Sequence, residues 1–193
     1  MDMWRETVSN ICSLGVEHIS CYSLKLEEGT RLYDMKEKGL IVLPDEDLDR
    51  EMYHYAVSVF EENGYAQYEI SNFAKPGFRC LHNLIYWKNE EYIGVGAGSH
   101  SKLDGTRFWN EAGIDGYVGL IERGSFPVAG GESVSEEEDM WETIILALRL
   151  NEGLDLDAFE SKYNVDFTSK YGKAIGKMKN TGLVSLEGKR LKL

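Results

Sequence analysis

The stretch LPDEDLDREMYHYAVSVFEENGY, Leu43–Tyr65, decides the fold class. It predicts a helix, because Pro44 precedes it, acidic side chains occupy its first turn, and Gly64 ends it. Apolar residues recur along it at three- and four-residue steps, the spacing of one helical face. That face consists of Leu48, Met52, Tyr55, Val59 and Phe60.

Two short, mostly apolar stretches flank this helix, 19–24 and 67–73, and both predict strands. A helix between two strands is a βαβ unit, which implies parallel pairing and a right-handed crossover. We therefore expect an α/β protein. A further helix before the first strand ends at Leu14, with Gly15 as its cap.

The segment after Pro76 gives weaker signals. Residues 80–89 fit a helix or a strand, and 91–95 predict a buried strand that leads into a glycine-rich turn. A strand at 105–111 and a short helix at 114–123 follow. The Gly/Pro-rich residues of RGSFPVAGG then predict a loop and a domain boundary.

The end of the chain predicts a small separate module. Ser135 and Glu138 form a capping box for a helix that runs through Leu150. Two more helices, 156–163 and 169–180, precede a hairpin with Gly188 in its turn. Three short helices and a hairpin are typical of a winged-helix-like module.

Composition and charge disfavour several classes of protein. Apolar residues make up 42% of the 193 residues, which is enough for a core. No stretch approaches the roughly 18 consecutive apolar residues of a membrane span, and residues 1–9 do not predict a signal peptide. The net charge of −12 disfavours non-specific nucleic-acid binding. Three scattered cysteines predict neither a disulfide framework nor a metal site, and a reducing, cytoplasmic setting is the simplest interpretation.

One stretch, RCLHNLIYWKNEEYIGVGAGSHS (79–101), gathers residues that suit a planar ligand. His82 and Asn83 precede the aromatic pair Tyr86 and Trp87. Neutral imidazole is a good ligand for iron, and aromatic rings make flat contacts with a macrocycle. A second interpretation stays open: a loop histidine with one hydrogen bond, beside two aromatic side chains that fill a core.

The glycines of GVGAGSHS in the same stretch permit positive φ and a close approach to the backbone. At the end of a parallel strand such a turn lies where α/β folds bind ligands. The spacing is not a dinucleotide fingerprint, and a tight turn packed on a neighbouring strand also explains it. Gly96, Gly98 and His100 are candidate contacts here, together with Ser23 near the end of the first strand.

We expect the two remaining histidines to be structural or solvent-facing. His18 begins the first predicted strand, and we expect it to make a structural hydrogen bond. His54 lies on the polar side of the predicted helix, and we expect it to face solvent.

Four separated stretches resemble one family. They are EHISCYSLKLEEGT (17–30), DREMYHYA (49–56), GYAQYEISNFAKPGFRCLHNLIYW (64–87) and YIGVGAGSHS (92–101). In this order they resemble the oxygen-independent coproporphyrinogen III oxidase-like radical SAM proteins. Within that family the HNxxYW motif resembles the HemW-type heme chaperones rather than the HemN-type oxidases, which carry a different segment there.

The resemblance implies an architecture in two parts. Residues 1–127 would form the later βα units of a partial TIM-like barrel, and 128–193 would form the winged-helix-like HemN C-terminal module. It also implies heme binding at four motif residues, His82, Asn83, Tyr86 and Trp87, with His82 as the expected iron ligand. His100 and Cys80 are the other candidates for the iron. A weaker match places Ser23, Gly96, Gly98 and His100 on the SAM side of the site.

The cofactor motifs of the family are the main departure. Its CxxxCxxC motif, which holds a [4Fe–4S] cluster, and its early glycine-rich SAM motif are absent from this sequence. We therefore expect a C-terminal fragment without a cluster and without radical chemistry of its own. SAM and the [4Fe–4S] cluster would belong to the full-length parent only.

Several functions follow as expectations. The first is heme binding, with transfer to an acceptor protein by the full-length parent. The alternative is an oxygen-independent coproporphyrinogen III oxidase, a radical SAM decarboxylase. A nucleic-acid-binding module is a third hypothesis, which the acidic charge opposes. An unpaired edge at strand 19–24 further predicts self-association, for example as a homodimer.

Overall fold

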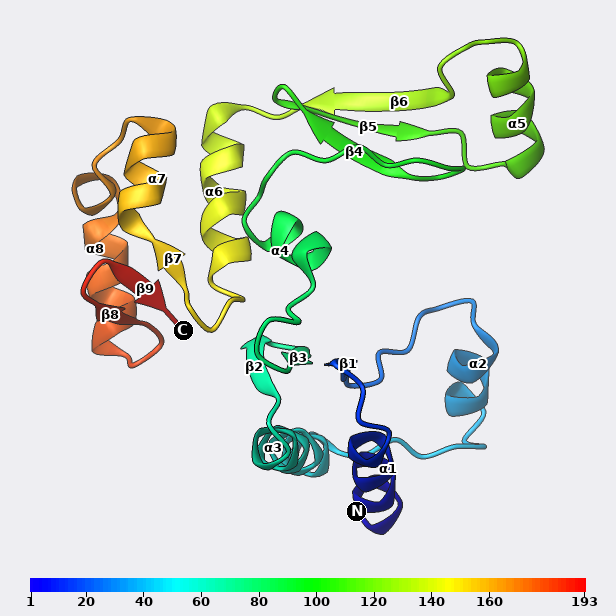
Figure 1. Cartoon of the computed structure of the whole chain (residues 1–193), viewed down its shortest axis with the longest axis vertical. Helices are drawn as coiled ribbons and strands as arrows, with labels where there is room; N and C mark the ends of the chain where they lie inside the picture. Colours follow the sequence, from blue (N-terminus) through cyan, green and yellow to red (C-terminus); the bar gives the residue numbers. More distant parts are fainter. The chain divides into compact units, whose positions relative to one another are not determined.

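The computed structural model describes residues 1–193 as two units, Met1–Arg79 and Cys80–Leu193 (Figure 1). The first unit contains α1 (Asp2–Ser13), β1 (His18–Ser20), α2 (Arg31–Glu37), α3 (Glu46–Glu62), β2 (Ala66–Glu69) and β3 (Asn72–Ala74). The second contains α4 (Leu81–Trp87), β4 (His100–Leu103), β5 (Thr106–Asn110), α5 (Ile114–Glu122), β6 (Val128–Ser133), α6 (Glu136–Ala147), β7 (Leu154–Asp155), α7 (Leu156–Tyr163), α8 (Phe167–Asn180), β8 (Ser185–Glu187) and β9 (Arg190–Lys192). None of the helices combines the length and the hydrophobicity that crossing a membrane requires.

The predicted helix of the first unit is confirmed as α3. The Asp45 carboxylate accepts a hydrogen bond of 2.8 Å from the backbone N–H of Leu48, which caps the first turn. Gly64 takes a φ of +83° directly after the helix and ends it. The apolar face of α3 packs with α1 and the sheet into a core of Val8, Ile19, Ala56, Phe60, Tyr65 and Phe73.

The strand pairing of this unit corrects one prediction. The expected strand 67–73 is interrupted by a turn at Ile70 and Ser71, so that β2 and β3 form an antiparallel hairpin. β1 also pairs with β3 in the antiparallel direction, which gives the sheet order β1-β3-β2. The direct parallel pairing of the two predicted strands is therefore wrong. β1 and β2, which precede and follow α3 along the chain, do run in the same direction, but β3 lies between them in the sheet.

The second unit begins with α4 and the antiparallel sheet β4-β5-β6, which carries α5 at one end (Figure 1). Two predictions fail here. Residues 91–95 form no buried strand, because Ile93 and Val95 are exposed and only Tyr92 makes a bridge, to Lys102. The predicted Gly/Pro loop also contains the start of β6, which pairs with β5 from Val128 onward.

The C-terminal module agrees closely with its prediction. The capping box of α6 is present, with the Ser135 hydroxyl and the Glu138 carboxylate each bonded to the other residue's backbone. Helices α7 and α8 follow, and β8 and β9 form the predicted hairpin, to which β7 adds a third strand. Their shared core contains Met140, Ile144, Ala147, Leu154, Leu156, Phe159, Tyr163, Phe167, Tyr171, Val184 and Leu191.

Candidate functional site

The HNxxYW residues all lie on α4, so the segment left open between helix and strand is a helix. A spacing of four places His82 beside Tyr86 and Asn83 beside Trp87, on neighbouring faces of the helix. The imidazole and the Tyr86 ring meet edge to face, with 4.8 Å between ring centroids. His82 is exposed and makes no hydrogen bond through its ring, whereas the other three motif residues are half-buried.

The second residue after this helix, Asn89, fixes where α4 ends. Asn89 takes a left-handed conformation, φ +55°, which asparagine tolerates better than most residues. Its backbone N–H donates to the Tyr86 carbonyl at 3.0 Å, and that of Glu90 donates to the Ile85 carbonyl at 2.9 Å. These two bonds form a Schellman motif, which stops the helix directly after the HNxxYW residues.

An aromatic row continues beyond α4. The Tyr92 ring lies 4.6 Å from the Tyr86 ring, centroid to centroid, in an edge-on contact. Burial, together with the nearby Tyr86, raises the pKa of Tyr92. Both tyrosines line a cavity of about 320 Å³, together with Ile145 and Leu146 of α6. Polar and charged side chains complete the lining: Asn89, Glu90, Lys102, Arg107 and Glu142. The motif helix therefore borders, through Tyr86, a pocket with both apolar and charged walls, and His82 lies outside its lining.

Trp87 faces the C-terminal module. The guanidinium carbon of Arg149 lies 4.5 Å from the centre of its ring system, a cation–π distance. Its indole Nε1–H is buried without a hydrogen-bond partner. An unpaired buried donor costs free energy, so the electrostatic contact over the ring face is the main polar interaction of this side chain.

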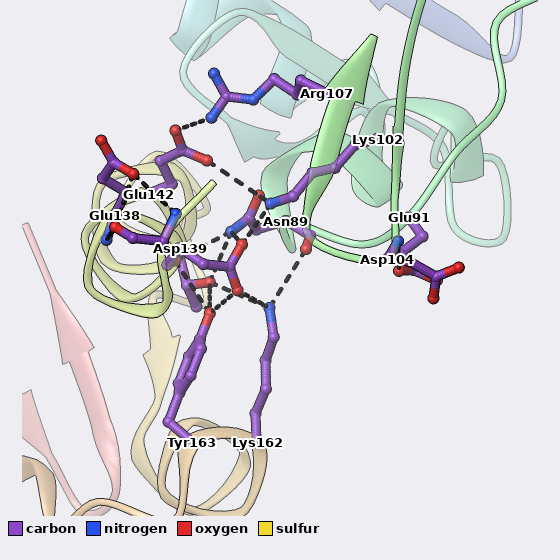
Figure 2. Close-up of polar contacts among 12 residues, drawn as sticks. Asn89, Glu91, Lys102, Asp104, Arg107, Glu138, Asp139, Glu142, Lys162 and Tyr163 are labelled. Carbon is purple, nitrogen blue, oxygen red and sulfur yellow. Dashed lines mark hydrogen bonds and ion pairs between the residues drawn. The ribbon is translucent and has the colours of Figure 1, made fainter. Parts of the chain in front are cut away.

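Next to α4 lies a charge cluster, formed by Asn89, Lys102, Asp139, Lys162 and Tyr163 (Figure 2). We call it the buried charge cluster because Asn89, Lys102 and Tyr163 are buried; Asp139 is partly buried and Lys162 is exposed. The Lys102 ammonium donates to the Asn89 side chain and to Asp139, the latter at 2.5 Å. Asp139 also accepts from the Tyr163 hydroxyl at 2.5 Å and pairs with Lys162 at 3.0 Å. Only 9% of the Lys102 side chain is exposed. Hydrogen bonds and ion pairs thus connect Asn89 and Lys102 to helix α6, through Asp139, and α6 to helix α7.

The electrostatics of the cluster favour a charged Asp139. Burial alone would raise the pKa of this carboxyl, but hydrogen bonds from Lys102, Tyr163 and Lys162 outweigh burial and hold the pKa far below its usual value. Burial and the hydrogen bond to Asp139 raise the pKa of Tyr163, which stays protonated as a donor. A carboxylate held this firmly is suited to structure rather than to proton transfer.

A larger cavity of about 720 Å³ borders the same cluster. Lys102 and Lys162 face it with Asp139 between them, and Arg190 at its edge pairs with Asp155 at 2.9 Å. These three cations already hold carboxylate partners, and Lys88 is the one further cation in the lining. The cavity therefore offers no cluster of unpaired positive charge to an anionic ligand.

The glycine-rich turn is engaged with its own unit. The N–H groups of Gly96 and Gly98 donate to the Tyr117 hydroxyl at 3.2 Å and to the Glu111 carbonyl at 2.9 Å. A Cβ on Gly94 would lie 2.2 Å from the carbonyl oxygen of His100, so this backbone approach requires glycine. The geometry favours a tight turn packed on β5 and α5, and its role toward SAM stays a prediction.

The remaining predicted residues are distributed between the two units. Ser23 lies in the first unit and donates to Asp49 at 3.0 Å, whereas Gly96, Gly98 and His100 lie in the second. His100 is exposed beside Trp109, and its ring makes no hydrogen bond. Cys80 is half-buried at the start of α4.

The two other histidines have the environments that were predicted. His18 makes a hydrogen bond of 2.9 Å with the Tyr68 hydroxyl, as expected of a structural histidine. His54 is exposed on α3, with only an edge contact to Tyr53. The cysteines are all free, and no three His, Cys, Asp or Glu side chains are grouped to hold a metal ion. The cysteines of this chain therefore do not fit a [4Fe–4S] cluster.

Sequence reasoning missed the residues that support α4. Arg149 and most of the buried charge cluster reach the helix from distant parts of the chain, with hydrogen bonds that join residues up to 73 positions apart, whereas Tyr92 lies five residues after the helix. No local pattern marks such partners. The four-residue spacing within HNxxYW was the one available signal, because it already indicates two helical pairs.

Comparison with known proteins defines the class first. Residues 134–193 match the HemN C-terminal domain family. The fold as a whole is similar to the coproporphyrinogen III oxidase HemN from Escherichia coli, a radical SAM enzyme, with a TM-score of 0.73. That match covers 98% of this chain and 47% of the other at 14% identity, so it shows the α/β fold alone. The C-terminal module is thus similar to the HemN C-terminal domain.

The particular relatives are heme chaperones. The chain is 37% identical to heme chaperone HemW of Bacillus subtilis, over 92% of this chain and 47% of the relative. It is 34% identical to heme chaperone HemW of Lactococcus lactis, over 99% of this chain and 50% of the relative. The chain therefore spans about half the length of the curated relatives it matches. The predicted relationship to the HemW and HemN proteins is confirmed.

Proposed function

We propose that this chain is the part of a HemW-like heme chaperone that binds heme through α4. His82 supplies the iron ligand, and Asn83, Tyr86 and Trp87 lie along the porphyrin. The observation that carries the proposal is the state of His82: its imidazole is exposed, makes no hydrogen bond, and stands at the end of an aromatic row. A neutral imidazole in that state is free to coordinate iron.

The side chains around Tyr86 support heme binding. The Tyr86 and Tyr92 rings and the aliphatic side chains of Ile145 and Leu146 form the apolar part of the pocket wall, which suits a planar macrocycle. Lys102 and Arg107 line the same pocket beside Glu90 and Glu142. His100 and Cys80 remain the alternative iron ligands. His100 is exposed near Trp109, and Cys80 lies two residues before His82 at the start of the same helix.

Titration with hemin tests the proposal. We expect His82→Ala to weaken hemin binding or to shift the Soret band, because an iron–imidazole bond is lost. The matched control is His54→Ala, since His54 is also exposed and also contacts a tyrosine ring, at 5.5 Å. His54→Ala is expected to leave affinity and band position unchanged.

Three results would oppose the assignment. Superimposable titrations of wild type and His82→Ala would remove His82 as the ligand, and the same experiment on His100→Ala and Cys80→Ser would then identify it. Equal losses in His82→Ala and His54→Ala would indicate non-specific hemin adsorption to surface histidines. Absence of hemin binding by the wild-type chain would overturn the proposal for this chain.

The full-length protein would use further cofactors and partners. By its relationship to HemW and HemN, it would contain a [4Fe–4S] cluster and SAM, for which Ser23, Gly96, Gly98 and His100 of this chain are candidate SAM-side residues. It would deliver heme to an acceptor protein in the cytoplasm. We expect the 193-residue chain not to cleave SAM.

Self-association is a further proposal about partners. In the first unit several large apolar side chains are exposed: Leu14, Tyr22, Leu24, Leu40 and Val42. Exposed apolar surface and an unpaired strand edge at β1 both favour association between copies. Sedimentation velocity should detect a dimer or larger species that increases with concentration, and a monomer at all concentrations would refute the proposal.

A coproporphyrinogen III oxidase is the alternative function. Its support is the likeness of the fold to HemN from Escherichia coli. Decarboxylation of coproporphyrinogen III by the full-length protein would favour it over the chaperone. Heme transfer without decarboxylation would favour the chaperone.

A further inference from the structure

We propose that Arg149, in the C-terminal module, is a positioning residue for the heme motif: its guanidinium orients Trp87 and so fixes α4. The inference rests on the proposed function of α4. It assigns the C-terminal module a direct role in ligand binding, in addition to forming its own core.

The geometry of Arg149 supports this role. Arg149 lies just after α6, and its backbone N–H donates to the Leu146 carbonyl at 3.1 Å, which fixes the start of its side chain. A cation at this point also interacts favourably with the negative end of the α6 dipole. The guanidinium carbon reaches a point 4.5 Å from the centre of the Trp87 ring system.

Trp87 needs such a partner. Its Nε1–H is buried and makes no hydrogen bond, so no polar contact at the ring edge fixes the orientation of the indole. A guanidinium over the ring face supplies an attraction that depends on orientation, and a partly desolvated pair of this kind is stronger than one in water. Together with Asn89, which ends α4 and enters the buried charge cluster, Arg149 leaves α4 little freedom to turn about its axis.

The position of His82 then depends on Arg149. His82 and Trp87 lie on different faces of one helix of seven residues, so a rotation that follows loss of the Trp87 contact also moves the imidazole. Arginine is suited to this task, because its planar head stacks on an aromatic face. A lysine retains the positive charge without the planar stack.

Hemin binding by position-149 variants tests the inference. We expect Arg149→Met, which keeps an apolar stem of similar length, to weaken hemin binding about fivefold and to shift the Soret band toward that of His82→Ala. Arg149→Lys, which keeps the charge without the planar stack, should lie between the wild type and Arg149→Met. The control is Arg5→Met, because Arg5 makes the same type of contact, 5.5 Å from the Tyr55 ring in the other unit. It should leave hemin binding unchanged.

Unfolding midpoints measured on the same variants separate positioning from stability. If Arg149→Met binds hemin with the wild-type affinity and Soret position, the inference is overturned. It is also overturned if the Met and Lys variants lose the same hemin affinity and both have a lowered unfolding midpoint, because the loss is then one of stability. If Arg149→Met does not fold, Arg149→Gln replaces it with the same two outcomes. If His82→Ala weakens hemin binding but Arg149→Met does not, this inference alone is rejected and the proposed function stands.

Discussion

The motif helix α4 and the buried charge cluster beside it both contain polar side chains that can bind a partner, but the structure uses them in opposite ways. On α4 the imidazole of His82 is exposed and makes no hydrogen bond, whereas in the cluster the Lys102 ammonium is held by Asn89 and Asp139. Groups whose bonding capacity is filled inside the protein contribute to architecture. A group that is left free at the surface, in an aromatic setting, is available to a ligand.

The two regions should therefore respond differently to mutation. Changes in the cluster should lower the stability of Cys80–Leu193 and alter hemin binding only indirectly. Changes at His82 should alter hemin binding at nearly constant stability.

The largest expected effect is that of Lys102→Met. The Lys102 side chain is 9% exposed, and its ammonium lies 2.5 Å from Asp139 and 3.7 Å from Glu142, so its removal leaves partly buried carboxylate charge with fewer partners. Breaking a buried pair on one side costs about 3 kcal/mol or more of unfolding free energy. Urea unfolding, followed by tryptophan fluorescence, measures this loss; Trp87, Trp109 and Trp141 report on Cys80–Leu193 and Trp4 on the first unit.

The control for this variant is Lys189→Met. Lys189 pairs with Asp157 at 3.1 Å, but both side chains are more than half exposed, so its removal should leave the urea midpoint unchanged. If both variants lost the same stability, the cluster would be no more structural than a surface ion pair.

The second effect is a dependence of stability on acid pH. Because the pKa of Asp139 is lowered in the folded state, the unfolded chain takes up a proton on this carboxyl near pH 4, before the folded chain does. Its contribution to stability is full above about pH 5 and falls as the pH drops through 4 toward the lowered pKa. Asp139→Asn should be less stable at pH 7 and should lose less on acidification.

Unfolding midpoints between pH 3 and pH 7 measure this difference. Asp157→Asn is the control, because its ion pair with Lys189 is exposed, and it should follow the wild-type profile. A profile of Asp139→Asn that runs parallel to the wild type would show that another carboxyl governs the acid transition.

The smallest expected effect on stability is that of His82→Ala. The side chain is exposed, and alanine favours a helix more than histidine does, so the unfolding free energy should change by no more than about 0.5 kcal/mol. The same urea measurement checks it. A loss as large as that of Lys102→Met would mean that His82 is structural, and the contrast between the two regions would fail.

Local signals predicted a large part of the fold. α3, α5, α7 and the C-terminal hairpin lie where periodicity and turn residues placed them, and the Ser135 capping box is present. These features depend on interactions within a few residues, which the sequence displays directly. The failures involve interactions across the chain: the turn at Ile70 and Ser71 reverses the strand direction, and residues 91–95 remain exposed although their composition suits a buried strand.

The candidate site divides in the same way. By itself the sequence determined the HNxxYW motif, its resemblance to heme chaperones and the residue types that suit iron and a macrocycle. Only the tertiary structure decided that His82 is free while His18 is bonded to Tyr68, and that Arg149 lies over Trp87. The physical reason is that helices and caps arise from neighbours in sequence, whereas burial and ion pairing depend on which distant segments the fold brings together.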